Sequence, residues 1–254
     1  MHCCASKGDD ELAICVERLS VRYADTHALR DASLRVKRGT LHMLVGANGS
    51  GKSTLLRACA GLLRREGRDV RVTGSVLVAA PSAFVFQNPD HQIILPSVGA
   101  DVAFGVARLG LSCEEIATRV EASLSAVGLQ GFGLRPVHTL SGGQKQRCAI
   151  AGALAEHPTV LLCDELTSFL DPSDQFSVVR SMRAVVDGPS KLTVLWVTHR
   201  LEELEFADRV TCLDNGRDIK CASGARMLQF LKTHEKSTEE PIDKRLLSML
   251  LEQH

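Results

Sequence analysis

Neither sign of charge is in excess in this 254-residue chain, which holds 30 basic and 30 acidic residues. Without a net positive field the chain has no general means of binding nucleic acid through its phosphates, so we expect no nucleic-acid partner. Long hydrophobic runs are missing too, because no apolar stretch approaches the roughly 20 residues of a membrane-spanning helix. If the protein acts at a membrane, another component is expected to hold it there.

The nine cysteines include no C-x-x-C pair, which argues against a disulfide framework and against a zinc site. Four of them lie in apolar segments and are predicted to be core residues of a protein in a reducing compartment, namely Cys59, Cys148, Cys163 and Cys212. Cys3 and Cys4 admit two interpretations, an acylated anchor or a reduced, frayed terminus. The first residues have no apolar core resembling a signal peptide.

Hydrophobic patterning predicts an α/β protein. Strands are expected over residues 14–36 around a turn at 24–27, and at 41–45, 75–78, 83–86, 159–163, 193–197 and 210–213, the last entering a tight turn at Asn215-Gly216. Helices are expected at 52–63 and within 98–156, with capping boxes at Ser112–Glu115 and Ser141–Gln144. Continuous apolar runs at 159–163 and 193–197 indicate a parallel sheet buried on both faces. The order predicts a mostly parallel sheet with an N-terminal antiparallel β part and an inserted helical piece.

The stretch "GANGSGKST" satisfies G-x-x-x-x-G-K-[ST] and stands between a predicted strand and a predicted helix. Glycines let successive backbone N–H groups approach a phosphate, and the helix N-terminus adds partial positive charge. Lys52 can reach the β- and γ-phosphates, and the Ser53 hydroxyl can ligate Mg²⁺. The predicted nucleotide-binding residues are Gly46, Ala47, Asn48, Gly49, Ser50, Gly51, Lys52, Ser53 and Thr54.

Three polar residues follow the two buried runs, at the strand ends where open α/β sheets bind ligands. Asp164 is placed to complete a Mg²⁺ shell with Ser53, and Glu165 to polarise an attacking water. His199 can donate a hydrogen bond to a γ-phosphate. The alternatives are an exposed acidic turn and a structural histidine, and both become weaker beside a phosphate loop.

The stretch "LSGGQKQR", residues 140–147, points to one family. Together with the phosphate loop, "LLCDE" and His199, it resembles the ATP-binding subunit of ABC (ATP-binding cassette) transporters over residues 14–230. The resemblance implies an ABC nucleotide-binding fold of the P-loop NTPase class that hydrolyses ATP with Mg²⁺. It implies that Gln87 is catalytic beside Glu165 and His199 and contributes to the metal shell formed by Ser53 and Asp164. It also implies further nucleotide contacts by Tyr23, Ser141, Gly142, Gly143, Gln144 and Asp171.

In this family two cassettes sandwich two ATP molecules, so the resemblance implies a second ABC ATPase subunit, identical or related. Many members have Pro where this chain has Leu166, and a small residue where it has Phe169. Because every catalytic residue type is present, we expect an active ATPase. Phe169 is expected to alter the contact between the cassettes.

"FQNPDHQIILPSVGADVAFG" is similar to the corresponding segment of energy-coupling-factor (ECF) importers and their cobalt and nickel relatives, and other stretches resemble their plastid-type branch. This implies a membrane-spanning T-component partner, a vitamin or metal ion as solute, and a peripheral position on the inner face of a membrane, in the chloroplast stroma or on the cytoplasmic side. Residues 93–95 are expected to be apolar contacts to that partner. Another ABC transporter subfamily or a soluble ABC protein remains the alternative. The expected divisions are a cassette over 12–231, its helical subdomain at about 90–157, and a tail over 232–254.

Overall fold

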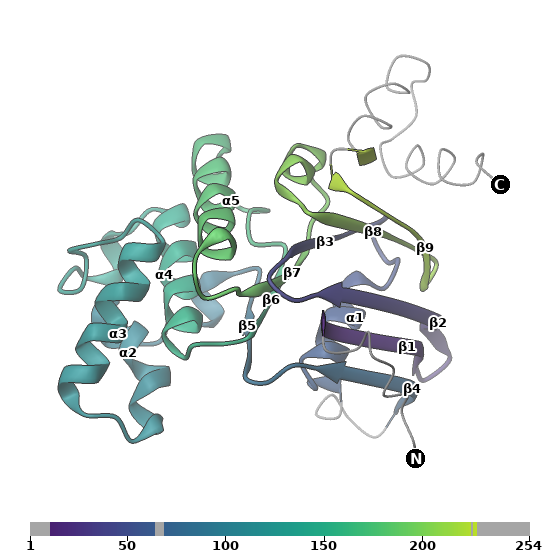
Figure 1. Cartoon of the computed structure of the whole chain (residues 1–254), viewed down its shortest axis with the longest axis horizontal. Helices are drawn as coiled ribbons and strands as arrows, with labels where there is room; N and C mark the ends of the chain where they lie inside the picture. Colours follow the sequence, from purple (N-terminus) through teal and green to yellow (C-terminus); the bar gives the residue numbers. More distant parts are fainter. Residues whose placement is uncertain (1–10, 64–68, 225, 228–254) are drawn as a thin grey trace.

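The computed structural model describes residues 11–63, 69–224 and 226–227, which form two sheets and a group of helices (Figure 1). A three-stranded antiparallel sheet has the order β2-β1-β4, with strands β1 (Leu12–Tyr23), β2 (Thr26–Lys37) and β4 (Val70–Val78). A six-stranded sheet has the order β5-β6-β7-β3-β8-β9. Its strands are β3 (Leu41–Val45), β5 (Ser82–Val85), β6 (Val160–Asp164), β7 (Thr193–Val197), β8 (Arg209–Asp214) and β9 (Arg217–Ala222). All its neighbours pair in parallel except β8 with β9.

The helices contribute to two separate hydrophobic cores, one on each face of the six-stranded sheet. Helix α1 (Lys52–Cys59) packs between the two sheets, where Leu55 and Leu56 join residues of β1 and β2 in one core. The other core lies on the opposite face of the six-stranded sheet and includes α2 (Val98–Val106), α3 (Cys113–Ala126), α4 (Gly142–Ala155) and α5 (Pro172–Asp187). In Figure 1, α2, α3 and α4 form the teal end of the molecule, away from the antiparallel sheet. None of the helices in the described part of the chain has the length and apolarity that crossing a bilayer requires.

Parallel pairing brings several loops to one edge of the six-stranded sheet. Strand β3 lies between β7 and β8, and β6 pairs with β7 in register, Asp164 opposite Val197. The backbone N–H of Glu165 donates to the carbonyl of Val197 at 3.0 Å, and that of Thr198 donates to Leu44 at 3.1 Å. The segments that leave β3, β6 and β7 therefore begin side by side, at the carboxyl ends where such sheets bind ligands.

Several local predictions are confirmed. Both capping boxes form, at Ser112–Glu115 and Ser141–Gln144, with side chain and backbone exchanging hydrogen bonds in each. The Asn215-Gly216 turn joins β8 to β9, and both residues have positive φ, 45° and 79°. The four cysteines predicted to be core residues are buried: Cys59, Cys148, Cys163 and Cys212.

Two boundary predictions were wrong. The helix expected at 52–63 ends at Cys59, and Gly61 follows with a φ of 69°. The strand expected at 75–78 begins at Val70, because it pairs with β1 as far as Tyr23. The apolar run 93–95, which is predicted to contact a partner, precedes α2, which begins at Val98; Ile93 packs on the core and Ile94 is 69% exposed.

His42 in β3 makes the stability of the fold depend on pH. Its side chain is 1% exposed, and Nε2 lies 2.8 Å from Thr211 Oγ1. Burial, and to a smaller extent the positive charge of Arg209, lowers the pKa of His42 to about 4, although Asp208 acts in the opposite direction. The unfolded chain takes up this proton below about pH 6.5 while the folded chain does not, so stability falls as the pH drops from 6.5 towards 4.

We therefore expect His42 to lower the free energy of unfolding by about 2 kcal/mol between pH 7.5 and pH 5. Urea unfolding of the wild type and of His42→Gln at both pH values measures the effect. Other titrating groups are common to both proteins and cancel in the comparison. An equal pH dependence in the two proteins would rule out His42 as the cause.

Candidate active site

The phosphate loop runs from the end of β3 to the start of α1, and its shape depends on glycine. Gly46 has a φ of 147°, and a Cβ there would lie 2.1 Å from the carbonyl oxygen of Leu213. The Lys52 side chain is buried and bends back over the loop, where Nζ donates to the carbonyls of Gly46 at 2.7 Å and Ala47 at 2.9 Å. The ammonium group of Lys52 is thus held by the carbonyl groups of the curled loop.

This loop fits a phosphate group. Gly51 is the N-cap of α1 with a φ of 101° and no side-chain cap, so the first N–H groups of the helix are not covered by a capping side chain. The hydroxyl of Ser50 is buried within the loop and has no hydrogen-bond partner. A buried polar atom of this kind gains a partner when an oxyanion occupies the loop.

Ser53 and Asp164 supply oxygen ligands of the kind that Mg²⁺ prefers. The Ser53 hydroxyl donates to Asp164 Oδ1 at 3.0 Å, so the two side chains already face each other. Burial raises the pKa of Asp164, and the neighbouring charge of Glu165 raises it too, whereas the hydrogen bond from Ser53 lowers it. A divalent cation would offset the cost of burying this carboxylate.

Glu165 is the centre of a cluster of side chains just beyond β6. Its Oε2 accepts hydrogen bonds from Gln87 Nε2 at 3.1 Å and from Ser168 Oγ at 3.0 Å. His199 Nδ1 lies 3.4 Å from the same oxygen. The backbone of Glu165 has a φ of 47°, which is unusual outside glycine and marks a position held by its surroundings. The structure therefore brings the three predicted catalytic residues to one carboxylate oxygen.

The predicted signature residues begin α4 and face a different element. Ser141 and Gly142 are exposed, and the Ser141 hydroxyl caps the N–H of Gln144 at 3.2 Å. The same hydroxyl donates to Asp174 on α5 at 3.2 Å, as does the N–H of Gly143, also at 3.2 Å. These residues contact α5, so they form a surface separate from the Glu165 cluster.

The remaining predicted nucleotide contacts lie at the ends of elements. Asp171 is the N-cap of α5, and its Oδ1 accepts from the N–H of Asp174 at 2.9 Å and from the Ser173 hydroxyl at 2.8 Å. These hydrogen bonds hold the pKa of Asp171 below its usual range. Tyr23 ends β1 opposite Thr26, partly exposed at the first hairpin. Asn48, Gly49 and Thr54 lie in the loop and the first turn of α1.

Sequence reasoning assigned no role to Ser168 or Asp174. Ser168 stands three residues after Glu165 in "ELTSFLD", and only the fold of this turn shows that its hydroxyl faces the carboxylate. Asp174 is 33 residues from Ser141, so nothing local connects them. The one available signal for Asp174 was its position three residues after the N-cap Asp171, where an acid favours the helix start.

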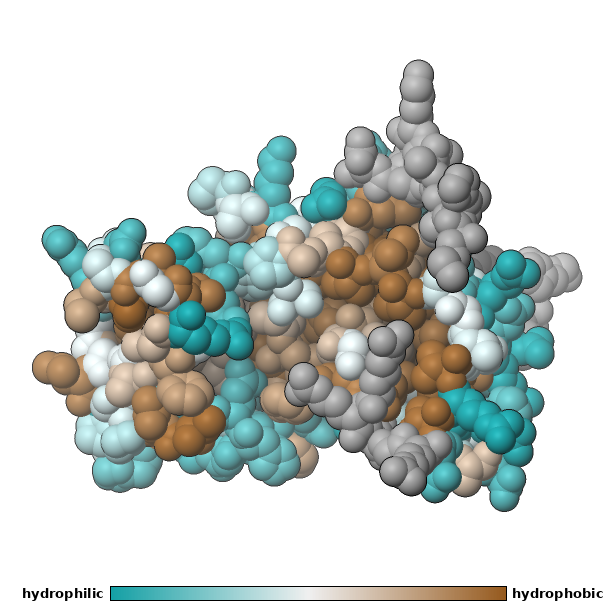
Figure 2. All heavy atoms as spheres, turned by 90° about the horizontal axis from the view of Figure 1, so that it is seen from below, coloured by the Kyte–Doolittle hydropathy of each residue, from teal (hydrophilic) through white to brown (hydrophobic). Residues whose placement is uncertain are grey.

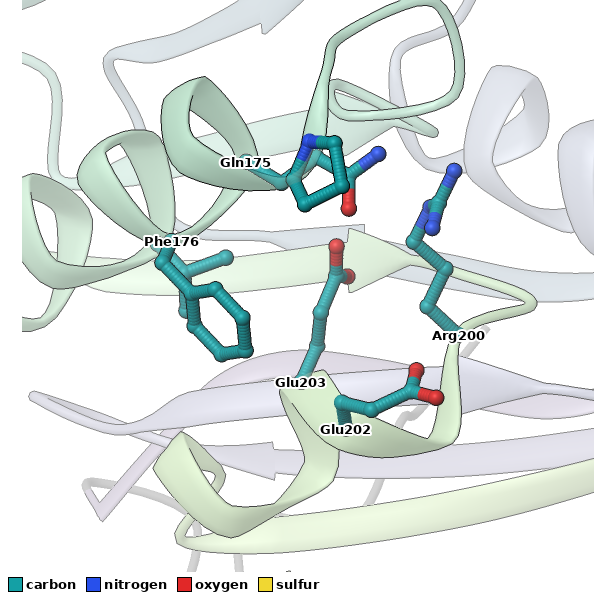
Figure 3. Close-up of a pocket in the computed structure, with 7 residues that line it drawn as sticks. Gln175, Phe176, Arg200, Glu202 and Glu203 are labelled. Atoms are coloured by element: carbon teal, nitrogen blue, oxygen red, sulfur yellow. The ribbon is translucent and has the colours of Figure 1, made fainter.

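A cavity of about 220 Å³ lies between the first two turns of α5 and the 3-10 helix η6 (Leu201–Phe206). Figure 3 shows the carboxylate of Glu203 pointing into it between Phe176 and Arg200. Glu203 is 4% exposed, and the hydroxyl of Thr167, two residues after Glu165, donates to its Oε1. Burial raises the pKa of Glu203. This buried pair anchors the turn that carries Glu165 to the segment that follows His199.

The sequence model of the family described as "ABC transporter" matches residues 29–168. The chain belongs to the ABC transporter ATPase family. It is 48% identical over 211 residues to ABC transporter I family member 10 of Arabidopsis thaliana, covering 82% of this chain and 76% of that protein. It is 36% identical over 236 residues to the energy-coupling factor transporter ATP-binding protein EcfA1 of Streptococcus sanguinis, covering 89% and 84%.

Two solved structures share the fold of this ABC ATPase. CbiO1 of Clostridium perfringens, described as part of the ABC transporter complex cbiONQ, has a TM-score of 0.78 and 29% identity, over 94% of this chain and 99% of that one. The dimeric ABC transporter cassette MJ0796 has a TM-score of 0.68 and 25% identity, over 83% and 98%. The predicted fold class, an ABC nucleotide-binding domain with a mostly parallel core, is confirmed, and the chain is an ATP-hydrolysing subunit by family.

Proposed function

We propose that this ABC ATPase powers import of a small solute, a vitamin or metal ion, through separate membrane subunits of the ECF type. The observation that carries the proposal is the Glu165 cluster, in which Gln87 and His199 meet one carboxylate oxygen next to the phosphate loop. The similarity to EcfA1 and to CbiO1, which is part of a transporter complex, supports the import role. The likeness to a plant protein supports the plastid-type branch, and with it a place on the stromal face of an envelope membrane.

In the proposed reaction Glu165 accepts the proton of the water that attacks the γ-phosphate of ATP. Gln87 and Ser168 hold one oxygen of its carboxylate, which fixes the direction in which the other can accept. His199 donates to the γ-phosphate, and Lys52 neutralises charge that develops on the β–γ bridge. Mg²⁺, held by Ser53, Asp164 and Gln87, would withdraw charge from the phosphate oxygens.

The proposed site is completed by a second ABC cassette. Ser141 and Gly142 are exposed at the N-terminus of α4, a helix of 14 residues, and an anion is favoured there. We assign to this surface, with Gly143, Gln144 and Asp171, the γ-phosphate bound by the partner cassette, and to Tyr23 a stack against adenine. The dimeric cassette MJ0796 shows that a chain of this fold pairs in this family.

The segment from Gln87 to Leu95 connects the Glu165 cluster to the proposed membrane partner. Gln87 donates to Glu165, and the N–H groups of Ile94 and Leu95 donate to Asp101 Oδ1 at 2.7 and 2.9 Å. Asp101 belongs to the first turn of α2, so the segment is fixed to the helical part of the molecule at its far end. The segment therefore links the Glu165 cluster to the start of α2.

Exposed apolar side chains beside this segment form the proposed docking surface. Phe86 is 41%, Ile94 69% and Phe104 58% exposed, and Phe104 lies on α2 three residues after Asp101. Figure 2 shows hydrophobic side chains over the helical end of the molecule on the face seen from below. A contiguous patch of exposed apolar side chains marks an interaction site, and we assign this one to a helix of the T-component.

Ile94→Ser is expected to weaken binding to the membrane partner at least 10-fold and to leave ATP hydrolysis by the isolated protein within 2-fold of wild type, in line with the roughly 1.5–3 kcal/mol of a buried aliphatic side chain. Co-purification of the tagged protein from detergent-solubilised membranes, with mass spectrometry of the retained proteins, measures the binding. Leu134→Ser is the control, because Leu134 is 97% exposed in the same part of the chain.

Equal loss of the polytopic partner in both variants would remove Ile94 from the docking surface. Recovery of ribosomes or soluble scaffolds by the wild type, with no polytopic membrane protein, would contradict the proposed import function.

A further inference from the structure

A carboxylate of the protein itself lies on the proposed phosphate surface of α4. Asp174 Oδ2 accepts from the Ser141 hydroxyl and from the Gly143 N–H, both at 3.2 Å. A Cβ added at Gly143 would lie 2.3 Å from Asp174 Cγ, so the carboxylate is packed directly against this backbone. The two donors that an incoming anion would use already have an anionic partner.

The capping of α4 does not depend on Asp174. The Ser141 hydroxyl accepts from the Gln144 N–H at 3.2 Å, and the Gln144 side chain accepts from the Ser141 N–H at 3.1 Å. This reciprocal pair satisfies two of the free N–H groups at the helix start without help from α5. The contact with Asp174 is therefore additional to the cap and can break without unwinding the helix.

Asp174 is held in place from its own side. Its N–H donates to Asp171 Oδ1 at 2.9 Å, which fixes its backbone in the first turn of α5. Helix α5 follows β6 and the Glu165 turn, and α4 packs with α2 and α3 as well as with α5. The Asp174 contact thus links the start of α4 to the element that follows the Glu165 cluster.

We propose that Asp174 is an internal anionic ligand of the α4 N-terminus, which competes with the partner cassette's γ-phosphate and so sets the ATP concentration at which two cassettes pair. A carboxylate and a phosphate would accept from the same two donors, the Ser141 hydroxyl and the Gly143 N–H. Two anions that share these donors repel each other. The carboxylate must leave before the phosphate binds. The inference rests on the proposed pairing and adds a competing ligand to it.

The test uses full-length protein carrying Glu165→Gln, which is expected to bind ATP and to hydrolyse it slowly. The ATP concentration that gives half-maximal dimer is measured by light scattering after gel filtration. Relative to Glu165→Gln alone, Asp174→Ala is expected to lower this concentration about 10-fold and Asp174→Asn about 3-fold, because hydrogen bonds to a charged group are the stronger ones. Asp174→Glu, which keeps the charge, is expected to stay nearer to the parent.

Asp187→Asn is the matched control, because Asp187 ends the same helix and pairs with Arg183 at 2.6 Å. Hydrogen exchange of the Gly143 amide without ATP checks the contact itself and is expected to rise about 10-fold in Asp174→Ala. Unchanged exchange, or a dimerisation midpoint that is unchanged or raised in both variants, would overturn the competition. If even Glu165→Gln forms no dimer with ATP, the proposed pairing fails, and the inference fails with it.

Discussion

Glu165→Gln is expected to lower the turnover number for ATP hydrolysis about 10²- to 10³-fold and to leave ATP binding within a few-fold of wild type. A general base of this kind contributes about 10²- to 10⁴-fold, and an amide cannot accept the proton of the attacking water. The substitution keeps the shape of the side chain, so its oxygen can still accept from Gln87 and Ser168, which lie 3.1 and 3.0 Å from the carboxylate. The loss is therefore chemical rather than structural.

Steady-state phosphate release and binding of a fluorescent ATP analogue separate the two effects. Glu114→Gln is the matched control, because Glu114 is an exposed residue of α3 and the same chemical change there should leave turnover intact. Turnover in Glu165→Gln within 3-fold of wild type would remove Glu165 from the role of base. Gln87 or another group beside the phosphate would then have to position the water.

The parts of the site that could be predicted from the sequence are those made by residues close together in the chain. The loop from Gly46 to Lys52 needs only a strand, glycines and a helix start, and each is visible in ten residues. The capping box at Ser141 likewise depends on residues three apart, and it forms as predicted. Glu165 and His199 could be placed at one edge because buried parallel strands end together, whereas the role of Gln87 was implied by the family resemblance.

Contacts between distant segments could not be predicted in the same way. The early start of β4 at Val70 comes from pairing with Tyr23, across more than forty residues of chain. The bond between Thr167 and Glu203 joins two loops that are close only because β6 and β7 are neighbours. Ile94 belongs to an apolar run predicted to contact a partner, and its side chain is exposed while its backbone N–H donates to Asp101. Exposure of one residue in such a run depends on loop geometry that composition does not encode.

Lys52→Ala is expected to weaken ATP binding about 100-fold, which corresponds to the roughly 2–3 kcal/mol of a hydrogen bond to a charged group. Its ammonium group is buried, and Nζ lies 2.7 Å from the Gly46 carbonyl, where no water replaces it without cost. A phosphate in the loop would face this cation directly, and alanine offers it neither charge nor donor. Equilibrium binding of the fluorescent ATP analogue measures the effect.

The fold should survive the change, because Lys52 is the first residue of α1 and alanine has the highest helix propensity. Lys37→Ala is the control: Lys37 ends β2, its side chain is 64% exposed, and its Nζ pairs with Glu11 at 3.3 Å. ADP should lose less affinity than ATP in Lys52→Ala, since it lacks the γ-phosphate that shares the cation. Unchanged ATP binding in a folded Lys52→Ala protein would mean that the loop's backbone N–H groups alone hold the phosphates, and the role of Lys52 would then be limited to bridging the carbonyls of Gly46 and Ala47.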